Sequence, residues 1–568
     1  MVLIVIINYA NSMRNGFVYD DHSFVINNPY IRDIHNWELY FTDSKNVQDP
    51  EGKFHIYRPL RTLLFSVEYK LFSLSASGYH FFSLILHIVN TLLVFWLIHL
   101  LVENNEVSLL GSAIFAVHPV QAETVNWVSV QSDLLASLFG ILALIYFVKG
   151  IHNRLLYILS VIMFIFALLS KEVSIIIPSV MALIVFLFIP SQLKIRNLYR
   201  IVPFIVLGLV YFVVRNKIIG QISQTIYWGG SIYTNFLAML KVYIIYIYNI
   251  LYPVNLSIEY DIKIPESIFN PIVLLSISIL IIAARYILYN LRSKEIVFGI
   301  LFCAIFLIPV SNIFPITALM ADRFLYNSMI GIGIVFSFYI NQIRVKYTKI
   351  TLILFTSIIL SFVMLTIMRN IVWKNDMVLW AYTAKNMNEN SKVLGNLAKS
   401  YAEKGMYDKT KKIYEKILAK KPNDLGALNG LGVCYYRLNE KKLAENIFLR
   451  SLELDSNNPF TLYNLAIIYL DRNDYNRARE LLVKAIEKHP YYSEGYSALG
   501  IVYSGCGMLD KAEASFIKAI QIQPLKGEFY LNLKFFYKNN MLPDTMFRKY
   551  FNEFKKLAPD SVWIPKLE

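Results

Sequence analysis

Charged side chains are scarce in this sequence: Asp, Glu, Lys and Arg make up only 17% of its 568 residues, whereas 56% are hydrophobic. Ordinary soluble proteins carry about 25% charged residues. The composition therefore excludes an ordinary soluble protein and indicates a polytopic membrane protein. The apolar runs end near residue 369, and the remainder is polar and rich in Lys, Glu, Asn and Tyr, which predicts two domains.

Cysteine is almost absent as well. Cys303 falls in an apolar run, and Cys434 and Cys506 lie far apart in the polar half, so the sequence has neither metal-ligand spacing nor a disulfide framework. The first residues, Met1 to Ile7, lack basic side chains and a small-residue cleavage site, unlike a cleaved signal peptide. They are fewer than the roughly 20 that a membrane span needs, which is compatible with a start further upstream.

The net charge of +15 is spread over both halves. Nucleic-acid-binding proteins also carry excess basic charge. Here we attribute the charge to basic loops that orient the membrane part and to a basic face of the soluble part near anionic lipid. We therefore expect membrane lipid, and no nucleic acid, among the partners.

Twelve apolar runs divide the first 369 residues. They lie at residues 1–13, 79–102, 108–129, 131–149, 154–170, 173–190, 199–214, 233–253, 271–289, 296–312, 326–342 and 350–369. His118, Pro119 and Glu123 interrupt the run at 108–129, so we expect its second half to leave the membrane. The amphipathic piece from Tyr57 to Phe65 is expected to lie in the membrane interface.

Basic residues in short loops orient such a protein, because these loops stay on the cytoplasmic side. Four loops carry them, namely Lys149 with Arg154, Lys194 with Arg196 and Arg200, Arg292 with Lys294, and Arg344 with Lys346 and Lys349. The loops share one side only if one run between the second and the third does not cross. The run 233–253, with Lys241, is the best candidate for a re-entrant or surface-lying segment. We therefore predict about eleven spans, with the polar half outside.

Polar residues at the ends of several runs fall on the outer face in this topology. They are Asp20, Asp21, His118, Glu123, Lys171, Glu172, Asp322 and Arg323. Each alone has a simpler explanation, as a solvated loop residue, a residue in a tight turn or a side chain that snorkels to water. Together they indicate a water-accessible cavity, because charges at membrane depth are costly. In it a carboxylate can activate a hydroxyl, and Arg and Lys can stabilise a departing phosphate.

The polar half repeats every 34 residues from about residue 388. Tyr and Leu recur at this spacing without a slip, at Tyr401, Tyr435, Tyr469, Tyr503 and Tyr537 and at Leu397, Leu431, Leu465, Leu499 and Leu533. Small residues recur as well, and Pro422, Pro490 and Pro524 close repeats. This is the tetratricopeptide pattern of two helices per unit. It predicts four repeats and a divergent fifth in an α-solenoid, with the tyrosines packed between helices.

The whole chain resembles the transmembrane and tetratricopeptide-repeat protein O-mannosyltransferases and their bacterial relatives, which have the GT-C glycosyltransferase fold. The resemblance rests on the order and combination of short pieces, since each alone is unspecific. They are Val18-Tyr19-Asp20-Asp21, Tyr57-Arg58-Pro59-Leu60, the stretch from Phe115 to Val125, Ser170-Lys171-Glu172, Asp322-Arg323-Phe324-Leu325-Tyr326 and the repeats. The short first run departs from the family. We expect a bacterial relative.

The resemblance implies an all-α protein. A GT-C-type multi-span membrane domain would occupy residues 1–370 and a linker 371–387. The tetratricopeptide-repeat α-solenoid would occupy 388–557 and a tail 558–568. The implied activity is transfer of mannose or another hexose from a polyprenyl-phosphate carrier to an acceptor hydroxyl, with inversion. The acceptor would be Ser or Thr of a protein, and the reaction would occur on the outer face of the membrane.

The resemblance also implies roles for the polar residues. Asp20 would act as base or orient the acceptor, with Asp21 beside it, and Arg58, Arg323 and Lys171 would bind the donor phosphate. Five further residues would order the site or bind sugar or acceptor, namely His118, Glu123, Glu172, Asp322 and Tyr326. Some GT-C enzymes use a divalent metal, and the sequence leaves a metal open. No other cofactor is expected.

Two other functions stay open at this point. The sugar could be transferred to a glycan or a lipid, or the chain could be a membrane-anchored scaffold whose site has decayed. The intact Asp20, Asp21, Arg58 and Arg323 argue against decay. The expected partners are the lipid-linked donor, membrane lipid and an acceptor protein that the repeats recruit. The expected location is a bacterial cytoplasmic membrane with the repeats outside, or an endoplasmic reticulum membrane with lumenal repeats.

Overall fold

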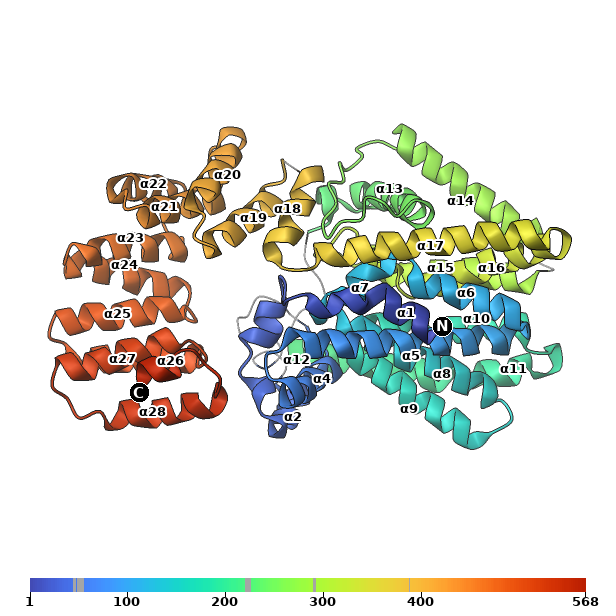
Figure 1. Cartoon of the computed structure of the whole chain (residues 1–568), viewed down its shortest axis with the longest axis horizontal. Coiled ribbons are helices and arrows are strands. Elements are labelled where there is room, and N and C mark those ends of the chain that lie inside the picture. The colour runs from blue at the N-terminus through green and yellow to red at the C-terminus, as the bar shows by residue number, and fades with distance from the viewer. Residues whose placement is uncertain (44–46, 48–55, 220–225, 290–292, 388) are drawn as a thin grey trace. The chain divides into compact units, whose positions relative to one another are not determined.

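The structure is a computed structural model that describes residues 1–43, 47, 56–219, 226–289, 293–387 and 389–568. All regular elements within these residues are helical (Figure 1), as predicted. The described residues form two compact units. The first, Met1–Ile26 with Ile34–Leu379, is called the membrane unit here, and the second, Asn27–Asp33 with Trp380–Glu568, the repeat unit.

Seven helical stretches among the described residues are long and apolar enough to cross a membrane. They lie in α5 (Ala76–Val102), the turn η6 (Val128–Val130) with α8 (Gln131–Lys149), α11 (Ser191–Tyr199) with α12 (Val202–Ile219), α13 (Ile232–Leu251), α14 (Pro271–Tyr289), α16 (Ser328–Lys346) and α17 (Thr348–Val372). Shorter apolar helices are α1 (Val2–Tyr9), α6 (Asn105–Val117), α9 (Arg154–Ser170), α10 (Ile177–Phe188) and α15 (Lys294–Leu307). These helices confirm a multi-pass membrane protein.

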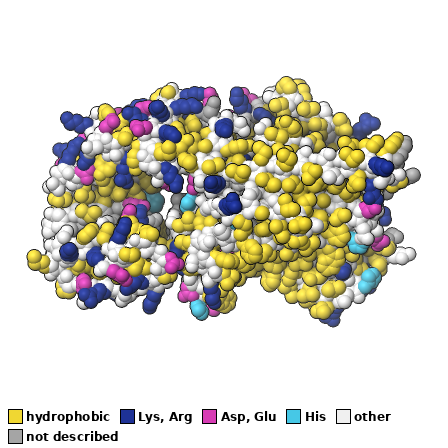
Figure 2. Space-filling model, viewed as in Figure 1, with side chains coloured by type: hydrophobic (Ala, Val, Ile, Leu, Met, Phe, Trp, Pro, Cys, Tyr) yellow, Lys and Arg dark blue, Asp and Glu magenta, His cyan; other side chains and the backbone are white. Residues whose placement is uncertain are grey.

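The helices differ in how much of their surface the protein covers. In the apolar stretch that contains α8, 78% is buried inside the protein, whereas the buried share of α14 is 11%. Helix α8 therefore belongs to the interior of the unit, and α14 has a lipid-facing surface. Figure 2 agrees, because hydrophobic side chains cover most of the visible face over the membrane helices, while Lys, Arg, Asp and Glu gather over the repeats.

Glycines let the inner helices approach closely. A Cβ on Gly299 of α15 would lie 2.6 Å from the Gly331 carbonyl oxygen of α16, and a Cβ on Gly333 would lie 2.7 Å from the Gly111 carbonyl oxygen of α6. Small residues are the usual contacts between membrane helices, because lipid tails leave close packing as the main attraction. Helix α16 is thereby fixed between α6 and α15, and the loop before it carries Asp322 and Arg323.

The interruption predicted at His118 is present. Helix α6 ends at Val117, and two short turns follow, η5 (Pro119–Gln121) and α7 (Ala122–Asn126). The run at 233–253 forms one continuous helix, α13, which is itself long enough to cross. The number of crossings and the side of the repeats therefore stay predictions. In the basic loops, Arg292 and the side chain of Lys346 lie outside the described residues.

The long polar connection between α1 and α4 contains several short helices. They are η1 (Ala10–Arg14), the single turn η2 (His22–Ile26), η3 (Tyr30–Arg32), η4 (Ile34–Asn36) and α2 (Trp37–Thr42). Helix α4 (Pro59–Phe72) then begins with proline. Proline suits the first helical position, because its missing N–H would have no partner there. The residue before it, Arg58, is left at the end of the helix.

The repeat unit consists of paired helices, as predicted. The pairs are α19 (Ser391–Glu403) with α20 (Tyr407–Lys420), α21 (Leu425–Arg437) with α22 (Lys441–Leu454), α23 (Pro459–Asp471) with α24 (Tyr475–Lys488), α25 (Ser493–Gly505) with α26 (Leu509–Ile522) and α27 (Gly527–Asn539) with α28 (Thr545–Leu557). Helix α18 (Asp376–Asn386) precedes them and α29 (Ile564–Leu567) follows.

A positive backbone φ recurs every 34 residues at the turn inside each pair. It occurs at Gly405, Asn439, Asn473, Gly507 and Met541. Glycine and asparagine tolerate this left-handed conformation, which costs other residues steric strain. Four turns therefore carry residues suited to them, whereas the fifth carries Met541. The division into four repeats and a divergent fifth stays a prediction.

Two glycines in the repeats differ in how much free space surrounds them. A Cβ on Gly500 of α25 would lie 2.7 Å from the Phe516 ring, whereas a Cβ on Gly395 of α19 would meet nothing within 4 Å. We expect Gly500→Ala to destabilise its pair by about 1 kcal/mol net, because overpacking outweighs the gain in helix propensity. We expect Gly395→Ala to stabilise its pair by a similar amount.

Hydrogen exchange of the full chain can measure both effects. Amides of α25 and α26 should exchange faster in Gly500→Ala, and amides of α19 and α20 more slowly in Gly395→Ala. Equal effects of the two substitutions would contradict the packing argument.

Candidate functional site

A cavity of about 430 Å³ opens in the membrane unit where several loops meet. Its charged lining residues are Asp20, Arg58, Arg61, Asp133, Lys171, Glu172, Arg215 and Arg323. These are five cations and three anions, so the lining has a formal charge of +2. An apolar wall completes the cavity, and it includes Pro309, Val310, Phe314, Ile316 and Phe324. The cavity can therefore hold a ligand that has an anionic end and an apolar end.

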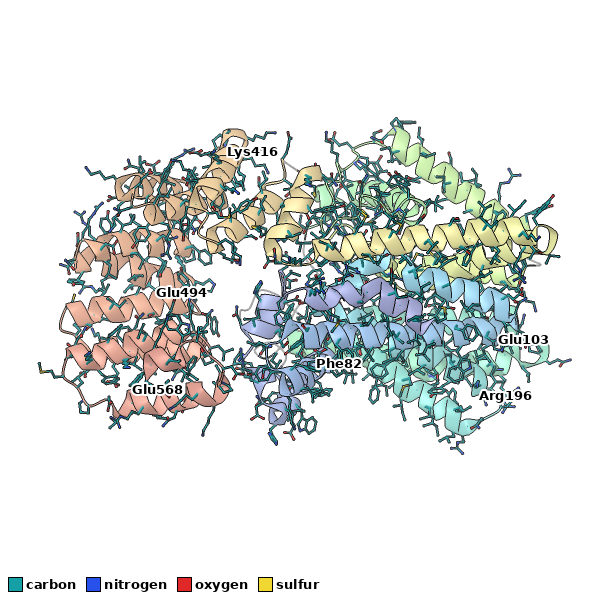
Figure 3. All side chains as sticks on the ribbon, in the orientation of Figure 1. Phe82, Glu103, Arg196, Lys416, Glu494 and Glu568 are labelled. Carbon is teal, nitrogen blue, oxygen red and sulfur yellow. The ribbon has the colours of Figure 1, made fainter. Side chains whose placement is uncertain are left out.

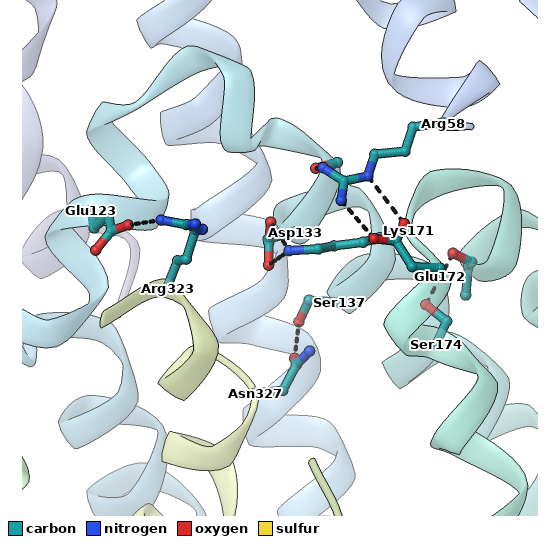
Figure 4. Close-up of polar contacts among 11 residues, drawn as sticks. Arg58, Glu123, Asp133, Ser137, Lys171, Glu172, Ser174, Arg323 and Asn327 are labelled. Carbon is teal, nitrogen blue, oxygen red and sulfur yellow. Dashed lines mark hydrogen bonds and ion pairs between the residues drawn. The ribbon is translucent and has the colours of Figure 1, made fainter. Parts of the chain in front are cut away.

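Three ion pairs organise the charged side of the site (Figure 4). Each pair joins elements that are distant in sequence. Because a charge taken out of water is costly without a partner, such pairs fix both side chains in place. The three pairs are Arg58 with Glu172, Lys171 with Asp133, and Arg323 with Glu123.

Arg58 binds Glu172 with two nitrogens. Its Nη2 lies 2.7 Å from Oε1 and its Nε lies 3.1 Å from Oε2. Burial alone would lower the pKa of the Arg58 guanidinium, but the charge and hydrogen bonds of Glu172 raise the pKa. The bidentate geometry orients the guanidinium plane. Arg58 is thus a fixed, permanent cation at the rim of the cavity.

Lys171 directly follows α9, and its side chain reaches the first turn of α8. Its Nζ lies 2.6 Å and 2.7 Å from the two oxygens of Asp133. Burial lowers the pKa of Lys171, and the neighbouring Asp133 opposes that shift. The pair therefore holds a cation at the cavity in a place where an isolated ammonium would tend to lose its proton.

Arg323 lies in the turn η10 (Asp322–Leu325) and is held on two sides. Its Nη1 donates to Glu123 Oε1 at 2.5 Å. Its guanidinium carbon lies 5.1 Å from the ring centroid of Trp127 and also 5.1 Å from that of Phe324. A cation above an aromatic ring is attracted by the negative face of that ring. Glu123 itself is buried, so it orients Arg323 from behind the cavity.

Asp322 points away from the cavity. Its backbone N–H donates to Glu123 Oε2 at 3.1 Å, and its Oδ1 accepts from Tyr260 at 2.6 Å and from Asn249 at 3.2 Å. Burial, and then the charge of Glu123, raise the pKa of Asp322. This carboxyl therefore ties the loop after α13 to the turn that carries Arg323.

Asp20 and Asp21 occupy a tight turn, residues 18–22, which we call the elbow. The Asp21 N–H donates to the Val18 carbonyl at 3.0 Å, and only Asp20 of the two carboxylates lines the cavity. Asp21 is fully buried. It accepts from the Val18 N–H at 3.0 Å, from the Ser129 N–H at 2.7 Å and from the Ser129 hydroxyl at 2.5 Å. Asp21 therefore anchors the elbow, and Asp20 is presented to the cavity.

His118 and Tyr326 lie outside the cavity lining. His118 is buried, with Nε2 2.9 Å from the Ile250 carbonyl oxygen. The Tyr326 hydroxyl lies 2.8 Å from Nδ1 of His87 and accepts from Asn90 at 3.2 Å. Both side chains hold helices together in this structure. Of the ten residues singled out in the sequence, the cavity wall contains Asp20, Arg58, Lys171, Glu172 and Arg323.

Sequence reasoning missed most of the apolar lining and also four charged or aromatic residues of it. They are Arg61, Trp127, Asp133 and Arg215. Asp133 and Arg215 had a usable signal, because each is a charge near the end of a long apolar run. Arg61 is buried, with its guanidinium carbon 4.2 Å from the Phe24 ring centroid, and Trp127 had no signal beyond its residue type.

The carboxylates do not assemble into a metal site in the described part of the chain, where no three His, Cys, Asp or Glu side chains form a suitable group. Asp133, Glu172 and Glu123 each bind a cationic side chain instead. The divalent metal that the sequence leaves open therefore has no assigned ligands among the described residues.

Comparisons with known proteins agree with both halves of the chain. Tetratricopeptide-repeat families match residues 396–459, 447–480 and 493–524. The human protein O-mannosyl-transferase TMTC3 is 25% identical over 501 residues, which are 78% of this chain and 54% of that protein. The protein O-mannosyl-transferase F38B6.6 of Caenorhabditis elegans is 25% identical over 427 residues, 73% of this chain and 61% of that protein.

These similarities confirm the resemblance inferred from the motifs. The chain spans about half the length of the curated relatives it matches, and a bacterial origin stays a prediction. Among solved structures, MamA from Desulfovibrio magneticus RS-1 is 20% identical, with a TM-score of 0.26 over 30% of this chain and 97% of that one. The TPR protein YrrB is 18% identical, with a TM-score of 0.25 over 33% of this chain and 96% of that one.

The ion pair of Lys171 and Asp133 should be sensitive to loss of either partner. We expect Asp133→Leu or Lys171→Met alone to lower the free energy of unfolding by about 3 kcal/mol, because each leaves one buried charge without its partner. The double variant Asp133→Leu with Lys171→Met should recover most of that loss. Unfolding of the four proteins in detergent measures the cycle. Additive losses would contradict a direct pair.

Asp21 should make stability depend on pH. Burial raises the pKa of Asp21 from 3.8 to about 7, while hydrogen bonds from Ser129 and Val18 oppose the shift. Below the lower pKa both the folded and the unfolded chain bind the proton. As the pH rises between the two values, only the unfolded chain releases it, so this group destabilises the fold by up to about 1.4 kcal/mol per pH unit.

Melting temperatures of the wild type and Asp21→Asn test this dependence. From pH 5 to pH 7.5 the wild type should lose stability relative to the variant, which has no proton to release. A constant difference between the two proteins would mean that Asp21 does not titrate in this range.

Proposed function

We propose, from the similarity to proteins named protein O-mannosyl-transferase and from the cavity, that this chain is a membrane glycosyltransferase. The donor is mannose or another hexose on a polyprenyl-phosphate carrier, and the acceptor is a Ser or Thr hydroxyl of a protein. One observation carries the proposal. A cavity of the membrane unit is lined by several cations, a carboxylate and an apolar wall. The cations suit the donor phosphate, the carboxylate suits the acceptor hydroxyl, and the apolar wall suits the isoprenoid of the carrier.

The reaction is a single displacement at the anomeric carbon. The acceptor oxygen forms a bond to that carbon while the bond from the carbon to the phosphate oxygen breaks. The hydroxyl proton passes to the Asp20 carboxylate, and the carrier phosphate leaves with the bonding electron pair. Attack from the side opposite the leaving group inverts the configuration. A carboxylate within reach of the hydroxyl is the usual base for such a step.

Cations stabilise the departing phosphate. Arg58, Lys171 and Arg323 line the cavity with orientations set by their carboxylate partners. Because these groups are already fixed, they need little reorganisation when negative charge develops on the phosphate. Arg61 and Arg215 add positive charge to the same wall. Because the lining has five cations and only three carboxylates, it keeps positive charge that can bind the phosphate of a ligand.

The apolar wall suits the carrier. Pro309, Val310, Phe314 and Ile316 belong to the loop that follows α15, and Phe324 lies beside Arg323. Burying isoprenoid surface there is favourable by about 25 cal/mol per Å². We place Asp133, Glu123 and Glu172 as residues that orient the cations, and Asp322 as the residue that orients the Arg323 turn.

The repeats recruit the acceptor protein in this proposal. Tetratricopeptide repeats form extended surfaces that bind other polypeptides. The apolar helices place the chain in a membrane with several crossings. The reaction then takes place on the outer or lumenal face, in a bacterial cytoplasmic membrane or in the endoplasmic reticulum.

Transfer of radiolabelled mannose from polyprenyl-phospho-mannose to protein in membranes tests the proposal. We expect Asp20→Asn to lower the rate at least about 100-fold, since removal of a base costs about 10² to 10⁴. The matched control is Asp408→Asn, which changes an exposed carboxylate of α20 and should leave the rate unchanged. Label in lipid instead of protein would indicate the other acceptor class. No label from any carrier-linked sugar would indicate a scaffold.

A further inference from the structure

Asp376 lies in the first turn of α18 and binds the elbow with both carboxylate oxygens. Its Oδ1 accepts from the Tyr19 N–H at 2.8 Å, and its Oδ2 lies 2.7 Å from Nε2 of His22. These two residues flank Asp20 and Asp21 in the sequence. The Asp376 carboxylate, which comes from the C-terminal end of the membrane unit, thus binds the residue on each side of Asp20 and Asp21. Asp376 itself is not part of the cavity lining.

The segment that precedes the elbow is hydrogen-bonded to the end of α17 and to the residues that follow it. The Asn11 side chain donates to the Ile367 carbonyl at 2.9 Å, and the Asn15 side chain donates to the Asn370 carbonyl at 3.0 Å. The Gly16 N–H then donates to the Lys374 carbonyl at 2.9 Å. The bonds to Asp376 continue this series, and they are its last members before Asp20.

Tyr19 is the residue on which the direction of Asp20 depends. It occupies the first central position of the turn from Val18 to Asp21, with a φ of 52°. Glycine is the usual residue at a turn position with positive φ, because a Cβ there is strained. A tyrosine persists in this conformation only when its surroundings impose it. The acceptor for the Tyr19 N–H is therefore part of what imposes it.

We propose that Asp376 is a positioning residue, which holds Tyr19 in the left-handed conformation and so keeps the Asp20 carboxylate in the cavity. Without the acceptor at Asp376, Tyr19 relaxes to a negative φ. That change rotates the peptide unit between Tyr19 and Asp20 and turns Asp20 out of the cavity. Asp21 remains bound to Ser129, so the elbow changes its direction without detaching. This inference rests on the proposed function only for the reaction that Asp20 performs.

Hydrogen exchange and transfer kinetics of Asp376→Ala test the inference together. Exchange of the peptide that spans Phe17 to Phe24 should become faster, because the Tyr19 N–H loses its acceptor. The kcat of transfer should fall about 10- to 100-fold, as expected for a misplaced catalytic group, with the donor KM changed less than about threefold. The matched control is Lys374→Ala, which changes an exposed side chain and keeps the backbone carbonyl that accepts from the Gly16 N–H just before the elbow.

Asp376→Asn guards against a folding defect, because it keeps one acceptor oxygen for the Tyr19 N–H. It should give intermediate values of both exchange and kcat. Unchanged exchange in the repeats verifies that each variant is folded. Unchanged exchange of the elbow in Asp376→Ala would overturn the inference, and so would faster exchange with the wild-type kcat.

Tyr19→Gly adds a readout that general loosening of the fold does not reproduce. Glycine adopts a positive φ without strain, so the elbow no longer depends on Asp376. We therefore expect Asp376→Ala to lower kcat less when Tyr19 is already replaced by Gly. The ratio of kcat for the double variant to kcat for Tyr19→Gly should lie closer to one than the ratio of kcat for Asp376→Ala to kcat for the wild type. Equal ratios would overturn the role assigned to Tyr19.

Failure of the proposed function is distinguishable from failure of this inference. If the wild type transfers no sugar from any donor, the proposed reaction is wrong, and hydrogen exchange alone decides whether Asp376 holds the elbow. Faster exchange confined to the elbow then supports the inference, and unchanged exchange overturns it.

Discussion

The cost of placing charge beside a membrane governs this structure. A charged side chain there is stable only where it meets water or an opposite charge. The cavity satisfies both conditions, because Arg58, Lys171 and Arg323 in its lining are paired with carboxylates on other elements and its volume of about 430 Å³ admits water or a polar ligand. Each pair also joins separate helices or loops. The same interactions that make the charges tolerable therefore also fix the geometry of the site.

Two adjacent carboxylates have different tasks for the same reason. Asp21 is buried against Ser129 and Val18, where its hydrogen bonds satisfy it, whereas Asp20 lines the cavity. A residue that anchors a turn cannot also approach a substrate. The motif thus contains one residue that anchors the turn and one that faces the cavity, rather than two carboxylates with the same surroundings. Glu123 and Asp322 both resemble Asp21, because both lie outside the cavity lining and hold the turn that carries Arg323.

Much of the fold could be predicted from the sequence, but the partners within the site could not. Apolar runs and the 34-residue spacing depend on local pattern, so helices and repeats were recognisable. Asp133, in contrast, looks like one charge at the end of an apolar run until the fold brings Lys171 to it across 38 residues. His118 and Tyr326 seemed to belong to the site because they stand in motifs beside Pro119 and Arg323. Their side chains lie among helices instead.

The elbow shows why such long-range partners matter for chemistry. Its turn contains a tyrosine with positive φ, so local preference opposes the conformation that the cavity needs. The compensating contacts come from Trp127, whose ring centroid lies 5.7 Å from that of Tyr19, and from Asp376. Trp127 also stacks on Trp373 and lies under Arg323. One shared group of side chains therefore contacts both the residue before Asp20 and the cation Arg323. In the proposed reaction Asp20 is the base and Arg323 is a phosphate-binding group, and their mutual geometry then requires the last membrane helix to be in place.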